Sequence, residues 1–168
     1  MKILTEGRIS IELPPRALGR KFDNPIDHGL THCMKSVDFI IEFKGEIYFL
    51  EIKDPSAAPL EIQKDRKKFL QQFCRGELDR DLSYKYRDSY LYLKGLNKIR
   101  KAAVYIVLII DDNLDQTSLL IRTDELRRQL PIQGPFDKPW PQPFIKDCIV
   151  FNSKIWNKRI PQFKLSIN

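Results

Sequence analysis

The sequence predicts an α/β fold, and three observations support this prediction. A β-rich stretch at 37–53 is divided by Lys44-Gly45, which indicates a hairpin of two strands. Two stretches with helical spacing follow, at 59–74 and 82–100. The run 103–110 is continuously apolar and rich in β-branched residues, which is typical of a strand covered on both faces. We therefore expect a central sheet with helices packed against both of its faces.

Length and composition favour one folded domain over 1–168. The chain has 168 residues, of which 42% are hydrophobic and 30% charged, so a core is expected and disorder is not. The longest apolar run, 102–110, is shorter than the ~20 residues of a membrane helix, and no signal peptide is recognised. Three cysteines without a CxxC pair predict neither a disulfide framework nor a zinc knuckle. These features predict a cytoplasmic protein with no membrane partner.

The segments before the hairpin are expected to be short. Residues 1–13 alternate weakly and predict a strand, which Pro14-Pro15 ends. A short helix is expected over 16–22, and turn residues fill 23–35.

Terminal residues and apolar spacing predict the bounds of the helices and of the late strands. Pro59 fits the first turn of the helix over 59–74. In the helix over 82–100, Tyr86, Tyr90, Leu93 and Leu96 recur at helical spacing, which favours a core stripe over base-stacking aromatics. The last third is predicted to hold a short helix over 124–130 with Thr123 as its N-cap, a Pro-rich surface loop over 131–143, and edge strands at 148–151 and 163–167.

The positive charge is concentrated in one stretch. The whole chain carries a net charge of +7, and residues 64–101 alone hold twelve Lys and Arg against five Asp and Glu. Such a field suggests a polyanionic partner, most plausibly nucleic acid, although a solvated helix surface would have the same composition. The residues expected to bind phosphates are Lys64, Lys67, Lys68, Lys85 and Arg87.

The hairpin places two acids together. If Lys44-Gly45 is a two-residue turn, Asp38 lies opposite Glu51, and Lys53 lies on the same face because side chains alternate along a strand. Opposed carboxylates on an otherwise apolar face are unfavourable, and a divalent cation such as Mg²⁺ or Mn²⁺ would resolve the conflict. Two alternatives are a solvated strand end and a simple Lys53–Glu51 salt bridge. A register slip of one residue would separate the acids.

Asp38, a gap of twelve residues and Glu51-Ile52-Lys53 resemble the PD-(D/E)XK nuclease superfamily. The resemblance is close over 36–55, where the hairpin is similar to archaeal Holliday-junction resolvases and related small nucleases. It implies a restriction-endonuclease-like αβββαβ core with a mixed central sheet. It also implies that Asp38, Glu51 and the Ile52 carbonyl hold Mg²⁺ (or Mn²⁺), and that Lys53 orients or deprotonates the attacking water.

The sequence departs from the superfamily pattern in two places. Val37 stands where many members have Pro, and no upstream acid is evident; Glu12 is the first candidate, followed by Glu6 and Asp23. Members often carry a Gln or Lys on the helix after the lysine strand, and Gln63 and Gln72 are both available.

The resemblance and the basic stretch together predict a hydrolase. We expect a metal-dependent endonuclease that cuts DNA, with RNA as a possible substrate and a homodimer as a possible assembly, because cutting both strands needs two active sites. The alternative is a catalytically weak or inactive nuclease-fold protein that binds nucleic acid or a protein partner.

Overall fold

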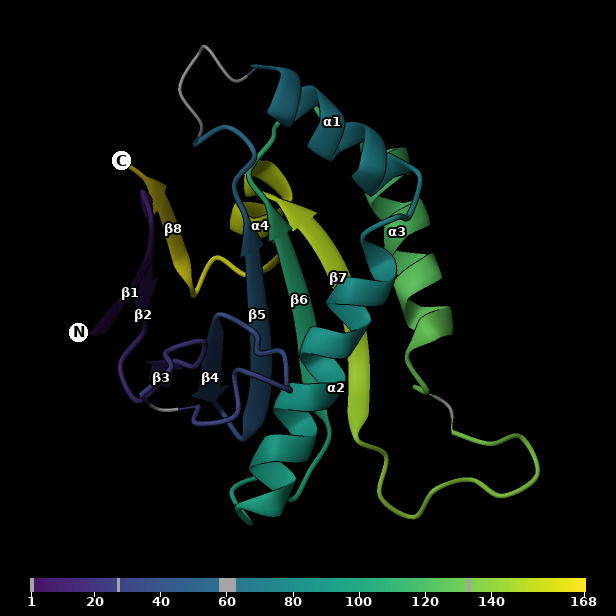
Figure 1. The fold of residues 1–168 in the computed structure, drawn as a ribbon. Helices are drawn as coiled ribbons and strands as arrows, with labels where there is room; N and C mark the ends of the chain where they lie inside the picture. The colour runs from purple at the N-terminus through teal and green to yellow at the C-terminus, as the bar shows by residue number, and fades with distance from the viewer. Residues whose placement is uncertain (1, 27, 58–62, 133) are drawn as a thin grey trace.

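A computed structural model describes residues 2–26, 28–57, 63–132 and 134–168, and Figure 1 shows its mixed α/β fold. The larger sheet has five strands in the described residues. β3, β4 and β5 are antiparallel, whereas β5, β6 and β7 are parallel, so the predicted mixed sheet is confirmed. In spatial order the strands are β3 (Leu18–Lys21), β4 (Phe39–Phe43), β5 (Glu46–Lys53), β6 (Ala103–Ile109) and β7 (Ile145–Asn152).

A smaller antiparallel sheet joins distant parts of the chain. It contains β1 (Lys2–Glu6), β2 (Ile9–Leu13) and β8 (Lys164–Ile167), with β2 in the middle. The single strand predicted over 1–13 is therefore two strands. They reverse at Gly7, whose φ of +53° suits a residue without a β-carbon.

The helix predicted over 16–22 is wrong, because this segment contains β3. Its residues pair with β4, and Gly19 approaches the side chains of Leu4 and Leu13 so closely that a β-carbon there would collide with them. Tertiary pairing thus overrides the weak local preference of a four-residue segment.

The predicted β4–β5 hairpin and its register are confirmed. Phe43 lies opposite Glu46 and Phe39 opposite Leu50. Lys44 and Gly45 both have positive φ, at 49° and 80°, as a two-residue type I′ turn requires. One further step in the same register places Asp38 opposite Glu51.

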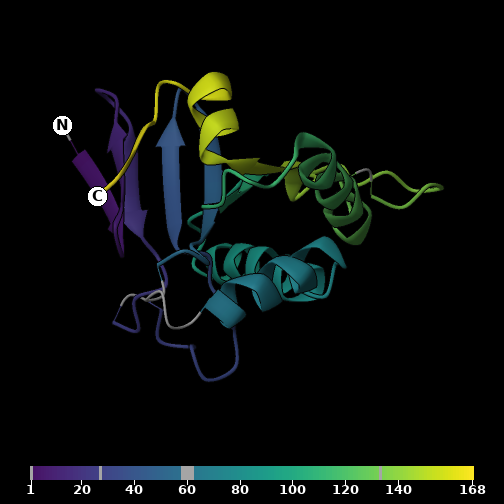
Figure 2. The same ribbon diagram turned by 90° about the horizontal axis from the view of Figure 1, so that it is seen from above.

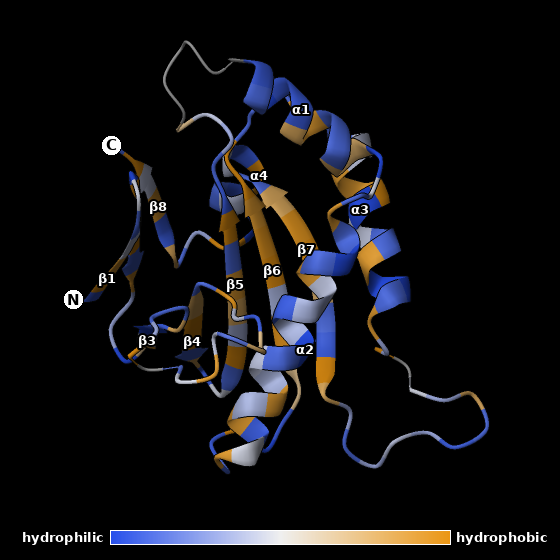
Figure 3. Ribbon diagram, viewed as in Figure 1, coloured by the Kyte–Doolittle hydropathy of each residue, from blue (hydrophilic) through white to orange (hydrophobic). Residues whose placement is uncertain are grey.

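Two hydrophobic cores lie on opposite faces of the larger sheet. On one face Phe49 and Tyr105 pack with residues of α1 (Gln63–Cys74), α2 (Asp79–Gly95) and α3 (Gln116–Gln129). On the other face Leu50 and Ile106 pack with the smaller sheet and α4 (Ser153–Arg159), which the sequence did not predict. Figure 2 shows this layering, and Figure 3 shows the hydrophobic strands β5–β7 in the middle of it. Helices thus occur on both faces, although the smaller sheet covers much of the second.

The bounds of the two long predicted helices differ from the structure. The helix predicted over 82–100 is α2, which starts one turn earlier and ends at Gly95. The predicted start of the first helix at 59–62 lies outside the described residues, and α1 is described from Gln63. Within the described part of the chain, no helix has the length and apolar character needed to cross a bilayer.

α3 begins earlier than the sequence predicted and covers the outer edge of β7. Its N-cap is Asp115, whose side chain accepts a hydrogen bond of 2.7 Å from the Ser118 amide, so the predicted N-cap at Thr123 is wrong. Thr123 lies inside the helix and accepts a hydrogen bond from the Val150 amide, while Arg127 donates to the Cys148 carbonyl. These side chains satisfy backbone groups that an edge strand leaves unpaired.

A buried ion pair connects α2 and α3. One guanidinium nitrogen of Arg122 lies 2.8 Å from Asp79 Oδ2, and the two side chains are 10% and 2% exposed. Burial raises the pKa of Asp79, and the nearby Arg122 charge opposes that shift. Gly76 leaves space for the guanidinium, because a β-carbon at this position would overlap it.

The late strands agree with the prediction, and the loop between α3 and β7 is irregular. The segment at 148–151 lies within β7, and the segment at 163–167 corresponds to β8, which begins one residue later; both are edge strands of their sheets. Residues 131–132 and 134–143 contain no helix or strand, and Phe136 is fully exposed there.

Candidate active site

The hairpin brings Asp38 and Glu51 together at the carboxyl end of β5. Asp38 Oδ2 accepts a hydrogen bond of 2.6 Å from the Ile52 amide, which fixes the carboxylate across the two strands. Asp38 is 6% exposed and Glu51 is fully buried. The acids therefore occupy a buried position, and the alternative of a solvated strand end is wrong.

Two lysines contact the same carboxylate oxygen. Lys53 Nζ lies 2.8 Å from Glu51 Oε1, as the salt-bridge interpretation predicted. Lys85 Nζ, on α2, lies 2.6 Å from that oxygen and 3.9 Å from Asp38 Oδ1. Lys85 is thus part of the acidic cluster, with a side chain only 18% exposed, whereas the sequence assigned it to an open phosphate-binding surface. The available signal was its position beside Leu82 and Tyr86, which face the core.

The pKa shifts reflect this crowding of charges. Burial and the neighbouring Glu51 raise the pKa of Asp38 to about 7, and the Ile52 amide and the two lysines oppose that shift. Burial would lower the pKa of Lys85, but the Glu51 charge and hydrogen bond raise it above its usual value. Lys85 is therefore a permanent cation beside an acid that is poised between its two protonation states.

The three upstream acids differ in their relation to this cluster. Glu12 lies on β2, 4.0 Å from Lys164, and Glu6 forms a 2.7 Å ion pair with Lys21. Asp23 lies 3.7 Å from the same Lys21, and burial raises its pKa; Lys85 and Glu51 make smaller contributions to that pKa. Lys85 and Glu51 thus influence Asp23, whereas the sequence ranked Glu12 first among the upstream candidates.

Few oxygen atoms at the site could coordinate a metal ion, but they are of the type that a hard cation prefers. In the described residues no three His, Cys, Asp or Glu side chains form a group that could hold a metal ion. Glu51 Oε2 is nevertheless buried and has no hydrogen-bond partner in that part of the chain, so its lone pairs are available to a ligand. Together with Asp38 and the Ile52 carbonyl, it offers oxygen donors of the type that Mg²⁺ and Mn²⁺ prefer.

The described structure does not connect either of the two candidate glutamines to the acidic pair. The side chain of Gln63 lies outside the described part of the structure. Gln72 is in the last turn of α1, and no described hydrogen bond joins its side chain to the acidic pair.

A cavity of about 340 Å³ opens beside Lys53. It lies between the end of β5 and the helices α1 and α2, with Phe69, Leu78 and Leu82 in its wall. Lys64, Lys67 and Lys68 are exposed on α1, the helix that contributes Phe69. Farther along α2, the guanidinium carbons of Arg80 and Arg87 lie 5.4 and 5.9 Å from the Tyr84 ring centroid. The wall of the cavity also contains Asp54 and Asp81, so Lys53 is its only basic residue among those described.

No family model, curated protein or solved structure matches the chain in the comparisons with known proteins.

Proposed function

We propose that the protein is a metal-dependent nuclease that hydrolyses phosphodiester bonds in DNA. The observation that carries the proposal is the buried Asp38–Glu51 pair with Lys53 on the same face. A buried pair of carboxylates needs compensating positive charge, which Lys53 and Lys85 supply here and which a metal ion in the place of Lys85 would also supply. The lysine motif resembles that of the PD-(D/E)XK superfamily.

The strand order supports the same proposal. The antiparallel strands β3, β4 and β5, followed by helices and a parallel β6, have the order of the βββαβ part of the restriction-endonuclease-like core. The upstream part differs from that core, because the described residues before β3 form the β1–β2 hairpin rather than a helix.

Each side chain then has a chemical role. Asp38, Glu51 and the Ile52 carbonyl would hold the metal, which polarises the scissile phosphate and lowers the pKa of a bound water. Lys53, whose ammonium lies 2.8 Å from Glu51, would orient that water; it would accept the water's proton only as the neutral amine, after giving up a proton of its own. Lys85 would leave Glu51 when the metal binds and pair with a phosphate oxygen. The exposed lysines of α1 would hold the backbone without reading bases.

A cleavage assay tests the proposal. We expect the protein to cut at least one member of a panel of duplex, junction, flap and single-stranded DNAs in Mg²⁺ or Mn²⁺, and chelation by EDTA to stop the reaction. Matched RNA substrates show whether RNA is also cut, and cross-linking at increasing protein concentration tests for a homodimer. Absence of cleavage on every substrate in both metals would contradict the nuclease assignment.

Lys85 and the metal are expected to compete for Glu51. The Lys85→Met variant should bind Mn²⁺ about tenfold more tightly in calorimetry, because the site loses a positive charge. The interaction energy of two unit charges 4 Å apart is about 4 kcal/mol at an effective dielectric of 20. This exceeds the free-energy difference that a tenfold change in dissociation constant requires. Lys94→Met, an exposed position on the same helix, is the matched control and should leave the affinity unchanged. Equal affinity in Lys85→Met and wild type would show that Lys85 does not occupy the metal position.

A second candidate function is nucleic-acid binding without cleavage. The observation that favours it is Lys85, which already compensates Glu51 at 2.6 Å and could replace a metal permanently. A ligand that binds the folded state must raise the melting temperature, so the absence of a thermal shift at millimolar Mg²⁺ and Mn²⁺, with DNA binding retained, would favour this second function.

A further inference from the structure

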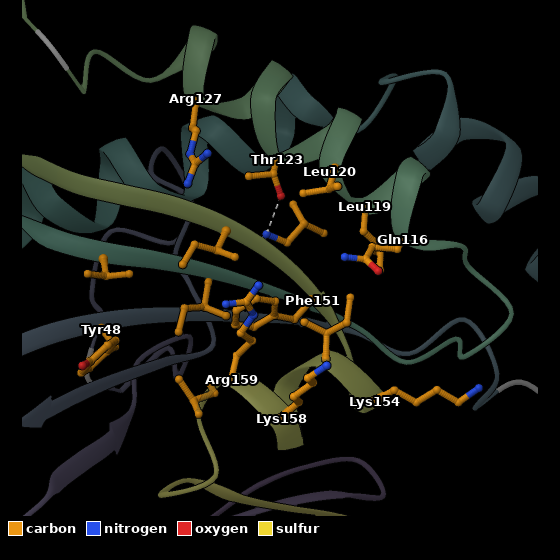
Figure 4. A pocket seen from close by; sticks show the side chains of 16 residues that line it. Tyr48, Gln116, Leu119, Leu120, Thr123, Arg127, Phe151, Lys154, Lys158 and Arg159 are labelled. Atoms are coloured by element: carbon orange, nitrogen blue, oxygen red, sulfur yellow. Dashed lines mark hydrogen bonds between the residues drawn. The ribbon is translucent and has the colours of Figure 1, made fainter.

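A second cavity lies on the sheet face opposite the acidic cluster. It has a volume of about 570 Å³ and lies between α3 and α4, over β6 and β7; we call it the α3–α4 groove. Its floor is apolar and consists of Val104, Ile106, Ile149 and Phe151. Figure 4 shows residues of α3 along one side of this floor and residues of α4 along the other.

The groove exists because the second face of the sheet is only partly covered. Buried parallel strands are normally packed on both faces. Here the smaller sheet and α4 bury Ile106 and Phe151, whereas Val104 and Ile149 remain partly exposed at the edge of that core. Apolar surface of this kind favours an apolar ligand, because binding would remove it from water.

The α4 side of the groove carries cations without acidic partners. In the described residues Lys158 and Arg159 form no ion pair, and Lys154 contacts only the Asp112 backbone carbonyl, at 3.4 Å. In Figure 4, Lys158 and Arg159 extend from α4 toward Phe151. On the opposite side Arg127 is neutralised by Asp147 at 2.9 Å. The free positive charge is therefore concentrated at one side of an apolar floor.

The apolar floor, the unpaired cations and the volume indicate which class of molecule the α3–α4 groove binds. None of the described residues that line the groove is acidic, so the same groove of a second copy docked here would offer no counter-charge to Lys158 and Arg159. The volume falls in the range of about 300–1,000 Å³ that is typical of small-molecule sites. We propose that the α3–α4 groove binds a small amphiphilic carboxylate, with its apolar chain on Val104 and Ile149 and its carboxylate at Lys158 and Arg159. This proposal is independent of the nuclease assignment, because the two sites lie on opposite faces.

Calorimetric titration with sodium dodecanoate below its critical micelle concentration tests the proposal. We expect saturable binding with one site and a dissociation constant on the order of 10–100 μM. The double variant Lys158→Gln/Arg159→Gln should bind at least tenfold more weakly, because both side chains are exposed and their replacement removes charge without opening the core. Arg128→Gln, an exposed residue of α3, is the matched control and should bind as wild type does. Glu51→Gln should likewise leave the affinity unchanged.

Three outcomes would overturn the proposal. They are no saturable binding up to 1 mM, equal binding of the cationic analogue dodecylamine, and unchanged affinity in the double variant with its fold intact by circular dichroism. Phosphatidylglycerol vesicles and a DNA duplex are run in parallel. If either binds at Lys158 and Arg159 while dodecanoate does not, the groove contacts a membrane surface or nucleic acid instead.

Discussion

Replacing Glu51 with glutamine is expected to abolish metal-dependent cleavage. Glu51 is fully buried, so glutamine preserves the shape of the side chain while removing the charge that a divalent cation requires. Mutation of a residue that only hydrogen-bonds to a metal ligand lowers metal affinity or activity by roughly 10–100-fold. Loss of the ligand itself should therefore lower the cleavage rate by more than about 100-fold. Single-turnover cleavage rates over a Mg²⁺ titration measure this effect.

The control for Glu51→Gln is Glu46→Gln on the same strand. Glu46 is partly exposed and pairs with Lys146 at 2.7 Å, away from the acidic cluster, so its cleavage rate should remain within about twofold of wild type. Both variants should retain DNA binding in EDTA, because the exposed lysines of α1 are unchanged. Cleavage by Glu51→Gln within tenfold of wild type would exclude Glu51 as a metal ligand.

Replacing Arg122 with methionine is expected to lower the free energy of unfolding by about 3–5 kcal/mol, because Asp79 would be left buried without its counter-charge. Urea denaturation measures the change. Arg128→Met is the matched control on the same helix, since Arg128 is 74% exposed and pairs with Glu125. The Arg128→Met variant should lower the free energy of unfolding by less than about 1 kcal/mol.

A double variant separates charge from packing. Asp79→Leu combined with Arg122→Met removes both charges, so it should be more stable than Arg122→Met alone. Equal unfolding free energies for Arg122→Met and Arg128→Met would show that the buried pair contributes no more than an exposed one.

The acidic cluster could be predicted because its geometry is local. Lys44 and Gly45 fix a two-residue turn, and the period of two along each strand then determines which side chains face one another. Asp38, Glu51 and Lys53 lie within sixteen residues of one another, so no long-range information was needed. The opposed acids and the Lys53 ion pair follow from this register.

The parts that were missed depend on contacts across the chain. The position of Lys85 against Glu51 requires the packing of α2 on the sheet, and β3 forms a strand because β4 is beside it. The influence of Lys85 on Asp23 similarly depends on contacts between distant parts of the chain. The start of α3 was a different error, since Asp115 with Ser118 three residues later is a local capping signal that was available.

The pairing of β2 with β8 has a consequence for folding during synthesis. Ser10 pairs with Ser166, so the second hydrophobic core closes only after the residues up to β8 have been made. At synthesis rates of about 5–20 residues per second, the β1–β2 hairpin waits on the order of ten seconds for β8 and for Trp156, which is fully buried in that core. During that interval the apolar side chains of Ile9 and Ile11 and the free edge of β2 have no partner, which exposes this hairpin to pairing with other chains.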